Sequence, residues 1–316
     1  MIPLAESEAA RARIAGSAVR TPLVRLHLPE SSLELYLKLE CLQPIGSFKL
    51  RGAANAIAQI PDAELARGVV TASAGNMAQG VAWAARARGI ACTVLVPEHA
   101  PETKVAAIGR LGGVVIRVPY ATWWQAIVEC GTELAEGPFI HPVQDPAVMA
   151  GNGTIGLELL EDLPDPDLVL VPYGGGGLIS GIGSVLAARR PEARLIGVEP
   201  ATGGGLNGAV AAGHPVEVEY TPSFVDGSGS RGVLDSMWPT VSGLIDGAAS
   251  VSLDETARAV QLLAERARVV SEGAGALALA AALSGRIDAG GKVVCIVSGG
   301  NIDSDKLATC LRGETP

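Results

Sequence analysis

Short apolar runs recur along the chain and are separated by segments with helical periodicity. The runs are continuous rather than alternating, which is typical of strands that are covered on both faces in a parallel sheet. They lie at residues 69–71, 92–96, 114–116, 168–171, 195–198 and 293–297, and the helical patterns lie at 77–88, 123–135, 178–189 and 253–267. This alternation predicts an α/β fold of two open, mostly parallel sheets flanked by helices.

The length of the chain allows one large or two modest domains. Its 316 residues, 48% of them hydrophobic, provide ample material for a buried core. A turn-rich break, His-Pro-Val-Gln-Asp-Pro, occupies residues 141–146. We expect a small domain over residues 47–142 and a large domain formed by residues 1–46 and 143–316.

Charge and cysteine content exclude several classes of protein. The net charge is −9 and no basic run occurs, which argues against nucleic acid or an anionic membrane as a partner. The five cysteines are scattered and no pair has metal-ligand spacing, as expected of reduced thiols in a cytoplasmic protein. The N-terminus lacks the layout of a signal peptide, and the most apolar stretch, Gly273–Leu283, is too short to span a bilayer. We therefore expect a cytoplasmic protein with a small-molecule partner.

A lysine follows a Gly-Ser-Phe turn where an extended run gives way to a helix. Ligands of open α/β sheets bind at the carboxyl ends of strands, and Lys49 belongs to one of four loops at such ends. A lysine in an apolar setting has a lowered pKa and can form a Schiff base with a carbonyl. Most lysines are solvated surface charges, so Lys49 gains meaning only from the other three loops.

Two of these loops carry small polar side chains. Residues 73–76, Ser-Ala-Gly-Asn, open a helix, where backbone amides, a hydroxyl and an amide side chain suit a carboxylate. An ordinary helix cap explains the same residues equally well. Ser298 follows the run at 293–297 and is positioned to bond a ligand heteroatom, although a turn residue is an equal alternative.

The remaining loop consists of four consecutive glycines between a buried strand and a helix. The amides of Gly174–Gly177 can converge on an anion near the helix start, and we expect this anion to be a phosphate group. A dinucleotide is disfavoured because the G-x-G-x-x-G match at residues 151–156 has no convincing strand before it. Pyridoxal phosphate is the one cofactor that needs all of these loops. Its aldehyde requires an amine, its phosphate requires an anion-binding site, and its ring nitrogen requires a hydrogen-bond partner.

Taken together, the loops and their surroundings resemble the fold-type II pyridoxal-phosphate enzymes of the threonine/serine dehydratase and serine racemase group. The resemblance covers nearly the whole chain. Its motifs lie at residues 38–53, 73–80, 150–158, 174–181 and 297–303. It implies a tryptophan synthase beta-like fold, with the cofactor in a cleft between a large and a small domain.

The resemblance also implies roles for individual residues. Lys49 would hold the cofactor covalently and act as the base at Cα. The remaining cofactor contacts would come from Phe48 beside the ring, Asn76 at the ring oxygen, Gly174, Gly175, Gly176, Gly177 and Leu178 at the phosphate, and Ser298 at the ring nitrogen. The substrate side would be formed by Ser73, Ala74, Gly75, Asn76, Gln79, Gly227 and Glu272.

The implied reaction is α,β-elimination from a β-hydroxy-α-amino acid, giving a 2-oxo acid and ammonia. Racemases of the group carry a second serine where this chain has Ala74, and alanine cannot donate a proton, so racemisation is disfavoured. A racemase or a β-replacement enzyme of the same fold remains the alternative. A noncatalytic module that binds a phosphate ligand is a further alternative from a different class.

Several positions depart from the family pattern. Met77 replaces a frequent histidine and is expected to make the rim of the site more apolar. Trp123 and Trp124 either pack in the core or line a pocket enlarged for a bulky substrate such as phenylserine, and Tyr173 could narrow the same region. His141 is expected to be structural.

Expectations about metal binding and about the oligomeric state come only from the family resemblance. Relatives often bind a divalent cation near the segment that begins at Glu199, but the expected aspartate is missing here, so no metal is predicted. A homodimer is the expected assembly.

Overall fold

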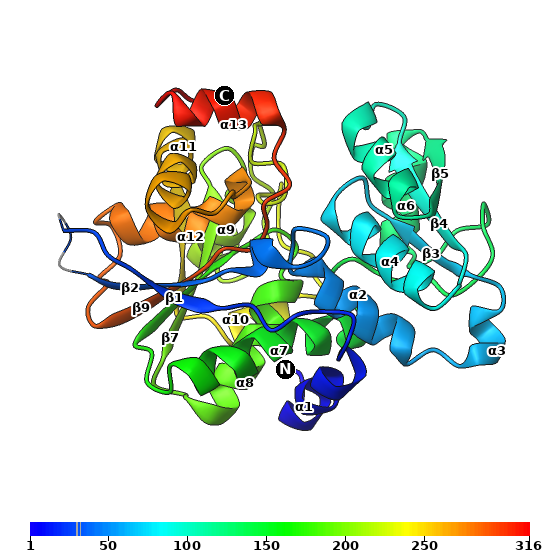
Figure 1. Cartoon of the computed structure of the whole chain (residues 1–316), viewed down its shortest axis with the longest axis horizontal. Helices are drawn as coiled ribbons and strands as arrows, with labels where there is room; N and C mark the ends of the chain where they lie inside the picture. The colour runs from blue at the N-terminus through cyan, green and yellow to red at the C-terminus, as the bar shows by residue number, and fades with distance from the viewer. Residues whose placement is uncertain (30, 32) are drawn as a thin grey trace.

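The structure is a computed structural model that describes residues 1–29, 31 and 33–316. In this part of the chain the strands form two sheets (Figure 1). The six-stranded sheet has the order β1 (Leu23–Leu26), β2 (Glu34–Lys38), β9 (Lys292–Ile296), β6 (Leu168–Pro172), β7 (Arg194–Pro200) and β8 (Gly247–Val251). The three-stranded sheet has the order β3 (Val69–Ala72), β4 (Cys92–Pro97) and β5 (Gly113–Val118). Every described pairing is parallel except that of β1 with β2, which confirms the predicted α/β class.

Helices cover both faces of the six-stranded sheet (Figure 1). On one face lie α11 (Leu253–Leu262) and α12 (Gly273–Leu283), with α13 (Ser304–Leu311) packed beyond α11. On the other face lie α7 (Pro146–Asp162), α8 (Gly177–Arg189) and α10 (Trp238–Ser242), with α1 (Leu4–Arg13) against α7. The helix α12 consists of Ala, Gly and Leu and is buried almost throughout, as expected of a helix that is apolar all round.

The smaller sheet is also covered on two sides. The helices α2 (Lys49–Ala58), α4 (Asn76–Ala87) and α5 (Glu102–Arg110) share one core with it, and α6 (Tyr120–Val128) covers the other side. The helix α2 contacts both α4 and α7, so it lies between the two sheets (Figure 1). The remaining elements are α3 (Asp62–Leu65), α9 (Gly205–Ala212), the 3-10 turn η1 (Glu40–Leu42) and the π-helical turn η2 (Leu263–Ala267).

All six predicted strands are present, and three further strands were not predicted. The missed strands are β1, β2 and β8. The strands β1 and β2 mix charged and apolar residues, and β1 lies at a sheet edge, so no continuous apolar run marks them. The strand β8, Gly-Ala-Ala-Ser-Val, lies at the opposite edge and is mostly half-buried. The edge position alone does not explain these omissions, because β3 and β5 also lie at sheet edges and were predicted, whereas β2 lies inside the large sheet. A strand without a continuous apolar run therefore lacks the signal, wherever it lies in its sheet.

Two of the helical patterns were predicted within a residue of their bounds, one extended past the end of its helix, and one is divided into two helical elements. The helices α4 and α8 match the patterns at 77–88 and 178–189. The pattern at 123–135 was wrong at its end, because α6 stops at Val128 and Cys130 has a φ of 54° followed by Gly131. The pattern at 253–267 divides into α11 and η2, and Arg268 at a φ of 61° ends the helical path.

A buried ionic cluster joins α2 to both β2 and α7. The guanidinium of Arg51 bonds both carboxylate oxygens of Glu40 at 2.8 Å and both oxygens of Glu158 at 2.7 and 2.8 Å. Lys38 donates to Glu158 at 2.6 Å. All four side chains are buried, and their formal charges cancel. Because Arg51 also donates to Thr154 at 3.0 Å, the cluster is saturated with partners and fixes α2 in place.

Replacing Arg51 by Met should cost about 3–5 kcal/mol of unfolding free energy, because two buried carboxylates lose their partner. Arg20→Met is the matched control, since Arg20 is about half exposed where it pairs with Glu161 and Asp162. That change should cost below about 1 kcal/mol. Urea denaturation of both variants measures the difference, and equal losses would contradict a special role of the cluster.

Candidate active site

Lys49 is the first residue of α2, and the turn before it is bonded to the loop after β9. The amide of Phe48 donates to the carbonyl of Ser298 at 3.0 Å, and the amide of Gly300 donates to the carbonyl of Gly46 at 2.8 Å. Ser47 forms an antiparallel bridge with Gly299. These bonds place the Lys49 turn and the predicted Ser298 loop side by side, although the two lie far apart in sequence.

The amine of Lys49 has no carboxylate partner among the described residues. Its Nζ donates to the carbonyl of Pro142 at 2.9 Å and lies 5.2 Å from the centre of the Phe48 ring. Burial lowers the pKa of Lys49 to about 8, because removal from water disfavours the charged form. Near pH 7 about a tenth of such an amine is unprotonated, far more than for an ordinary lysine. Lys49 is therefore a competent nucleophile and base near neutrality.

The glycine loop adjoins the segment that accepts the Lys49 amine. It follows β6, and Gly177 begins α8. A Cβ atom at Gly175 would lie 2.4 Å from a methyl group of Val143, so only glycine fits this approach. Val143 directly follows Pro142, so the backbone amides of the loop and the Lys49 amine converge on one region. Bare amides at a helix start suit an anion.

Asn76 connects the loop after β3 to Glu272 and Asn301, two residues that lie on the side of the large sheet. It begins α4, and its Nδ2 donates to Glu272 Oε1 at 2.8 Å. Its Oδ1 accepts from Nδ2 of Asn301 at 2.8 Å. The neighbouring predicted residues Ser73, Ala74, Gly75 and Gln79 are each partly exposed at the same end of β3 and α4.

Glu272 is a buried carboxyl group at the start of α12. Burial first, and the negative charge of Asp226 second, raise the pKa of Glu272 to about 8. A Cβ at Gly227 would lie 3.6 Å from Glu272 Oε1, so these two predicted residues are neighbours. Asp226 forms an ion pair with Lys104 of α5, which brings the small sheet's helices to the same place. Glu272 consequently keeps its proton to a higher pH than an ordinary glutamate does.

The structure corrects the interpretation of Met77 and places Tyr173 and the two tryptophans. Met77 lies in the core of the small sheet and not at the rim, because it follows Asn76 around the helix onto the buried face. Tyr173 is buried beneath the glycine loop, where its ring lies 3.3 Å from the Cβ position of Gly176. Trp123 packs in the core cluster between α6 and the small sheet, and Trp124 is 43% exposed. Core packing, one of the two interpretations of this pair, therefore applies to Trp123, whereas Trp124 lies at the surface.

His141 and Glu199 have structural partners. Nδ1 of His141 accepts from the amides of Val143 and Gln144 at 3.0 and 2.9 Å, and burial lowers the pKa of His141 to about 4. The carboxylate of Glu199 accepts the amides at the start of α9, and burial raises the pKa of Glu199 to about 7. Within residues 1–29, 31 and 33–316, no His, Cys, Asp and Glu side chains are grouped so that three could hold a metal.

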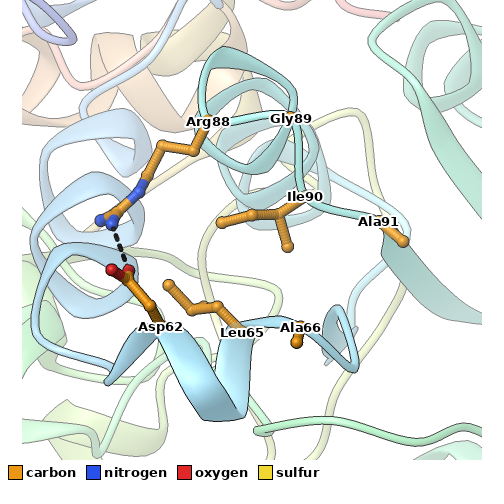
Figure 2. A pocket seen from close by; sticks show the side chains of 7 residues that line it. All are labelled: Asp62, Leu65, Ala66, Arg88, Gly89, Ile90 and Ala91. Atoms are coloured by element: carbon orange, nitrogen blue, oxygen red, sulfur yellow. Dashed lines mark hydrogen bonds and ion pairs between the residues drawn. The ribbon is translucent and has the colours of Figure 1, made fainter.

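A hollow of about 280 Å³ lies elsewhere, between α3 and the turn after α4 (Figure 2). Arg88 and Asp62 point toward one another across it at 3.4 Å. None of the predicted site residues lines this hollow, so it is separate from the Lys49 region. Among the described residues, every helix is too short or too polar to cross a bilayer.

Some residues of the site were missed from the sequence. Asn301 was seen only as the end of the Ser298 loop, and Pro142 only as part of a turn. Lys104 and Asp226 carried no signal at all. Their importance comes from tertiary neighbours, because a backbone carbonyl or a single surface charge has no local pattern that marks a site.

The family model for pyridoxal-phosphate dependent enzymes matches residues 14–299. The chain belongs to this family, and its Lys49, glycine-loop and Asn76 geometry fits that class of enzyme.

The relatives are closely similar proteins of comparable length. An L-threonine ammonia-lyase of Geobacter sulfurreducens is 41% identical over 99% of this chain and 79% of its own length. A catabolic L-threonine dehydratase of Escherichia coli is 40% identical over 95% of this chain and 93% of its own. Among solved structures, maize serine racemase superposes with a TM-score of 0.91 at 33% identity, covering 98% of this chain and 97% of its own.

Modification of Lys49 in cofactor-free protein by an amine-reactive reagent should follow a pH midpoint of about 8, because burial lowers the pKa of this amine. The modified fraction is to be measured by peptide mass spectrometry across pH 6–11. A lysine in a short peptide serves as the control, with a midpoint near 10.4. A midpoint for Lys49 equal to that of the peptide would show that the amine is fully solvated.

Proposed function

We propose that this protein is a pyridoxal-phosphate-dependent ammonia-lyase that converts threonine or serine to a 2-oxo acid and ammonia. The observation that carries the proposal is the Lys49 amine, which has a pKa lowered to about 8 beside the glycine loop. Relatives named L-threonine ammonia-lyase and L-threonine dehydratase, about 40% identical over nearly the whole chain, support the choice of substrate. The core position of Trp123 favours these small substrates over phenylserine.

The proposal includes the cofactor contacts that the family resemblance implies, and the loop geometry is compatible with them. Lys49 would hold the aldehyde carbon, and the amides of Gly174–Gly177 with Leu178 would bind the phosphate. Phe48 would pack beside the ring, and Ser298 would meet the ring nitrogen. Glu272 takes one of the two hydrogens of Asn76 Nδ2, which leaves the other for the ring oxygen. When bound, the cofactor supplies an electron sink for the bonds at the substrate's Cα.

The chain's own residues would then position the substrate and move its proton. The start of α4, with Ser73, Ala74, Gly75 and Gln79, would bind the substrate carboxylate through amides and short polar groups. The free amine of Lys49 would take the proton from Cα. The hydroxyl of Ser298, unlike a carboxylate, would leave the ring nitrogen of the bound cofactor uncharged, and the cofactor would then be a weaker electron sink. This would favour elimination, in which the Cα proton and the β-hydroxyl are lost as water, over return of the proton to Cα.

The organisation of the protein is part of the same proposal. The small domain would comprise residues 47–142, and the large domain residues 1–46 and 143–316. The ion pair between Lys104 and Asp226 and the bond between Asn76 and Glu272 connect these two parts near the proposed substrate side. We further propose a homodimer that acts in the cytoplasm.

Threonine added to the cofactor-loaded enzyme should yield equal amounts of 2-oxobutanoate and ammonia. Borohydride reduction should fix the cofactor on Lys49, and Lys49→Ala should show no reduced adduct and at least a thousandfold lower rate. Lys306→Ala, a change at a partly exposed lysine of α13 remote in sequence from Lys49, is the control. A new β-substituted amino acid or the D-isomer as the main product would favour the alternatives. Wild type that binds no pyridoxal phosphate would leave only a noncatalytic module.

Replacing Ala74 by Ser should add measurable racemisation of serine, because the new hydroxyl can return a proton to the opposite face of Cα. Ala74 is partly exposed in the loop between β3 and α4, so the change is sterically mild. Chiral chromatography of serine recovered from the reaction measures the D-isomer. Ala78→Ser on the buried face of α4 is the control and should give none. Equal D-serine from both variants would contradict the role of position 74.

A further inference from the structure

Asn301 forms hydrogen bonds whose direction is fixed by the backbone. Its Nδ2 donates to the carbonyl of Ile45 at 2.9 Å and to Oδ1 of Asn76 at 2.8 Å. A carbonyl oxygen only accepts, so the nitrogen end of the Asn301 amide must face Ile45. The oxygen end lies against the Lys49 turn, where a Cβ at Gly46 would come within 2.7 Å of it. Asn301 is therefore held in one orientation.

The fixed orientation of the Asn301 amide determines the orientation of the Asn76 amide. Both hydrogens of Asn301 Nδ2 are used, and the second one requires an acceptor on Asn76. Asn76 must then present Oδ1 to Asn301 and Nδ2 to the opposite side, where it donates to Glu272. An asparagine without such a neighbour can turn its amide over at little cost, because its two ends have nearly the same shape.

We propose that Asn301 is a positioning residue that sets the direction of the Asn76 amide, so that a donor and not an acceptor faces the ring oxygen of pyridoxal phosphate. The inference rests on the proposed function, in which Asn76 contacts that oxygen. The ring oxygen is an acceptor, and a reversed Asn76 would oppose it with a second acceptor. Asn301 touches no reacting atom and acts through Asn76 alone.

The decisive variant is Asn301→Asp, which keeps the shape of the side chain and removes its donors. An aspartate cannot donate to Ile45 or Asn76, so Asn76 is expected to turn its Nδ2 toward the new carboxylate. The dissociation constant of pyridoxal phosphate should rise roughly ten- to hundredfold, the usual effect of losing one hydrogen bond to a charged acceptor. The visible band of the bound cofactor should shift to the position seen in Asn76→Ala.

A double-mutant cycle separates positioning from general damage. In the Asn76→Ala background, Asn301→Asp should change the dissociation constant less than about twofold, because its target is already absent. The matched control is Asn55→Asp, since Asn55 also donates to a backbone carbonyl, that of Ala147 at 2.7 Å, but lies farther along α2. This control should leave both affinity and spectrum unchanged.

Three results would overturn the inference. They are wild-type affinity in Asn301→Asp, the same loss in both backgrounds of the cycle, and a visible band unlike that of Asn76→Ala. If Asn301→Asp does not fold, judged by the melting temperature of cofactor-free protein, Asn301→Ala replaces it and should weaken binding about three- to tenfold. Wild type that binds no pyridoxal phosphate would overturn the proposed function itself, whereas normal wild-type binding with unaffected variants would overturn only the role of Asn301.

Discussion

The position of α2 depends on the buried cluster of Arg51, Glu40, Glu158 and Lys38. Buried ion pairs seldom add much net stability, because desolvation offsets their attraction, but a broken pair is costly. A cluster whose charges cancel, and in which every N–H of Arg51 has an acceptor, tolerates one arrangement only. Arg51 lies two positions after Lys49, and residues so spaced point to different sides of a helix. The cluster thus binds one side of the start of α2, while the Lys49 amine faces Pro142 on another side.

Parallel strands explain why distant segments meet at this place. The loops after β6 and β9 leave the carboxyl ends of neighbouring parallel strands of the large sheet, and the Lys49 turn follows the parallel strand β2. The loop after β3 belongs to the smaller sheet, and Asn76 joins it to this place through its bonds to Asn301 and Glu272. Backbone bonds from Phe48 and Gly46 to the loop after β9 then join sequences some 250 residues apart. A site assembled in this way needs few large side chains, because much of its polarity is supplied by main-chain amides at loops and helix starts.

The central strands and the glycine loop could be predicted because each leaves a local pattern. Continuous apolar runs mark buried parallel strands, and four consecutive glycines between strand and helix have few other uses. The rest could not be predicted for physical reasons. Edge strand β8 is half-buried and has no apolar run, and the error at Met77 came from the helical phase, which only the packed structure defines. Asn301 matters through the direction of one amide, which depends on the carbonyl of Ile45.

The electrostatics of the site follow from burial more than from ion pairing. Glu272 lies near Asp226, and both acids could not be ionised there without repulsion. Lys104 forms an ion pair with Asp226, whereas Glu272 forms no ion pair among the described residues, and burial with the nearby charge of Asp226 raises the pKa of Glu272 to about 8. In the same pH range burial drives the Lys49 amine toward its uncharged form. A region that is rich in backbone amides, and in which burial disfavours ionisation of Glu272, can accept a phosphate and a carboxylate, whereas an ionised Glu272 would repel both.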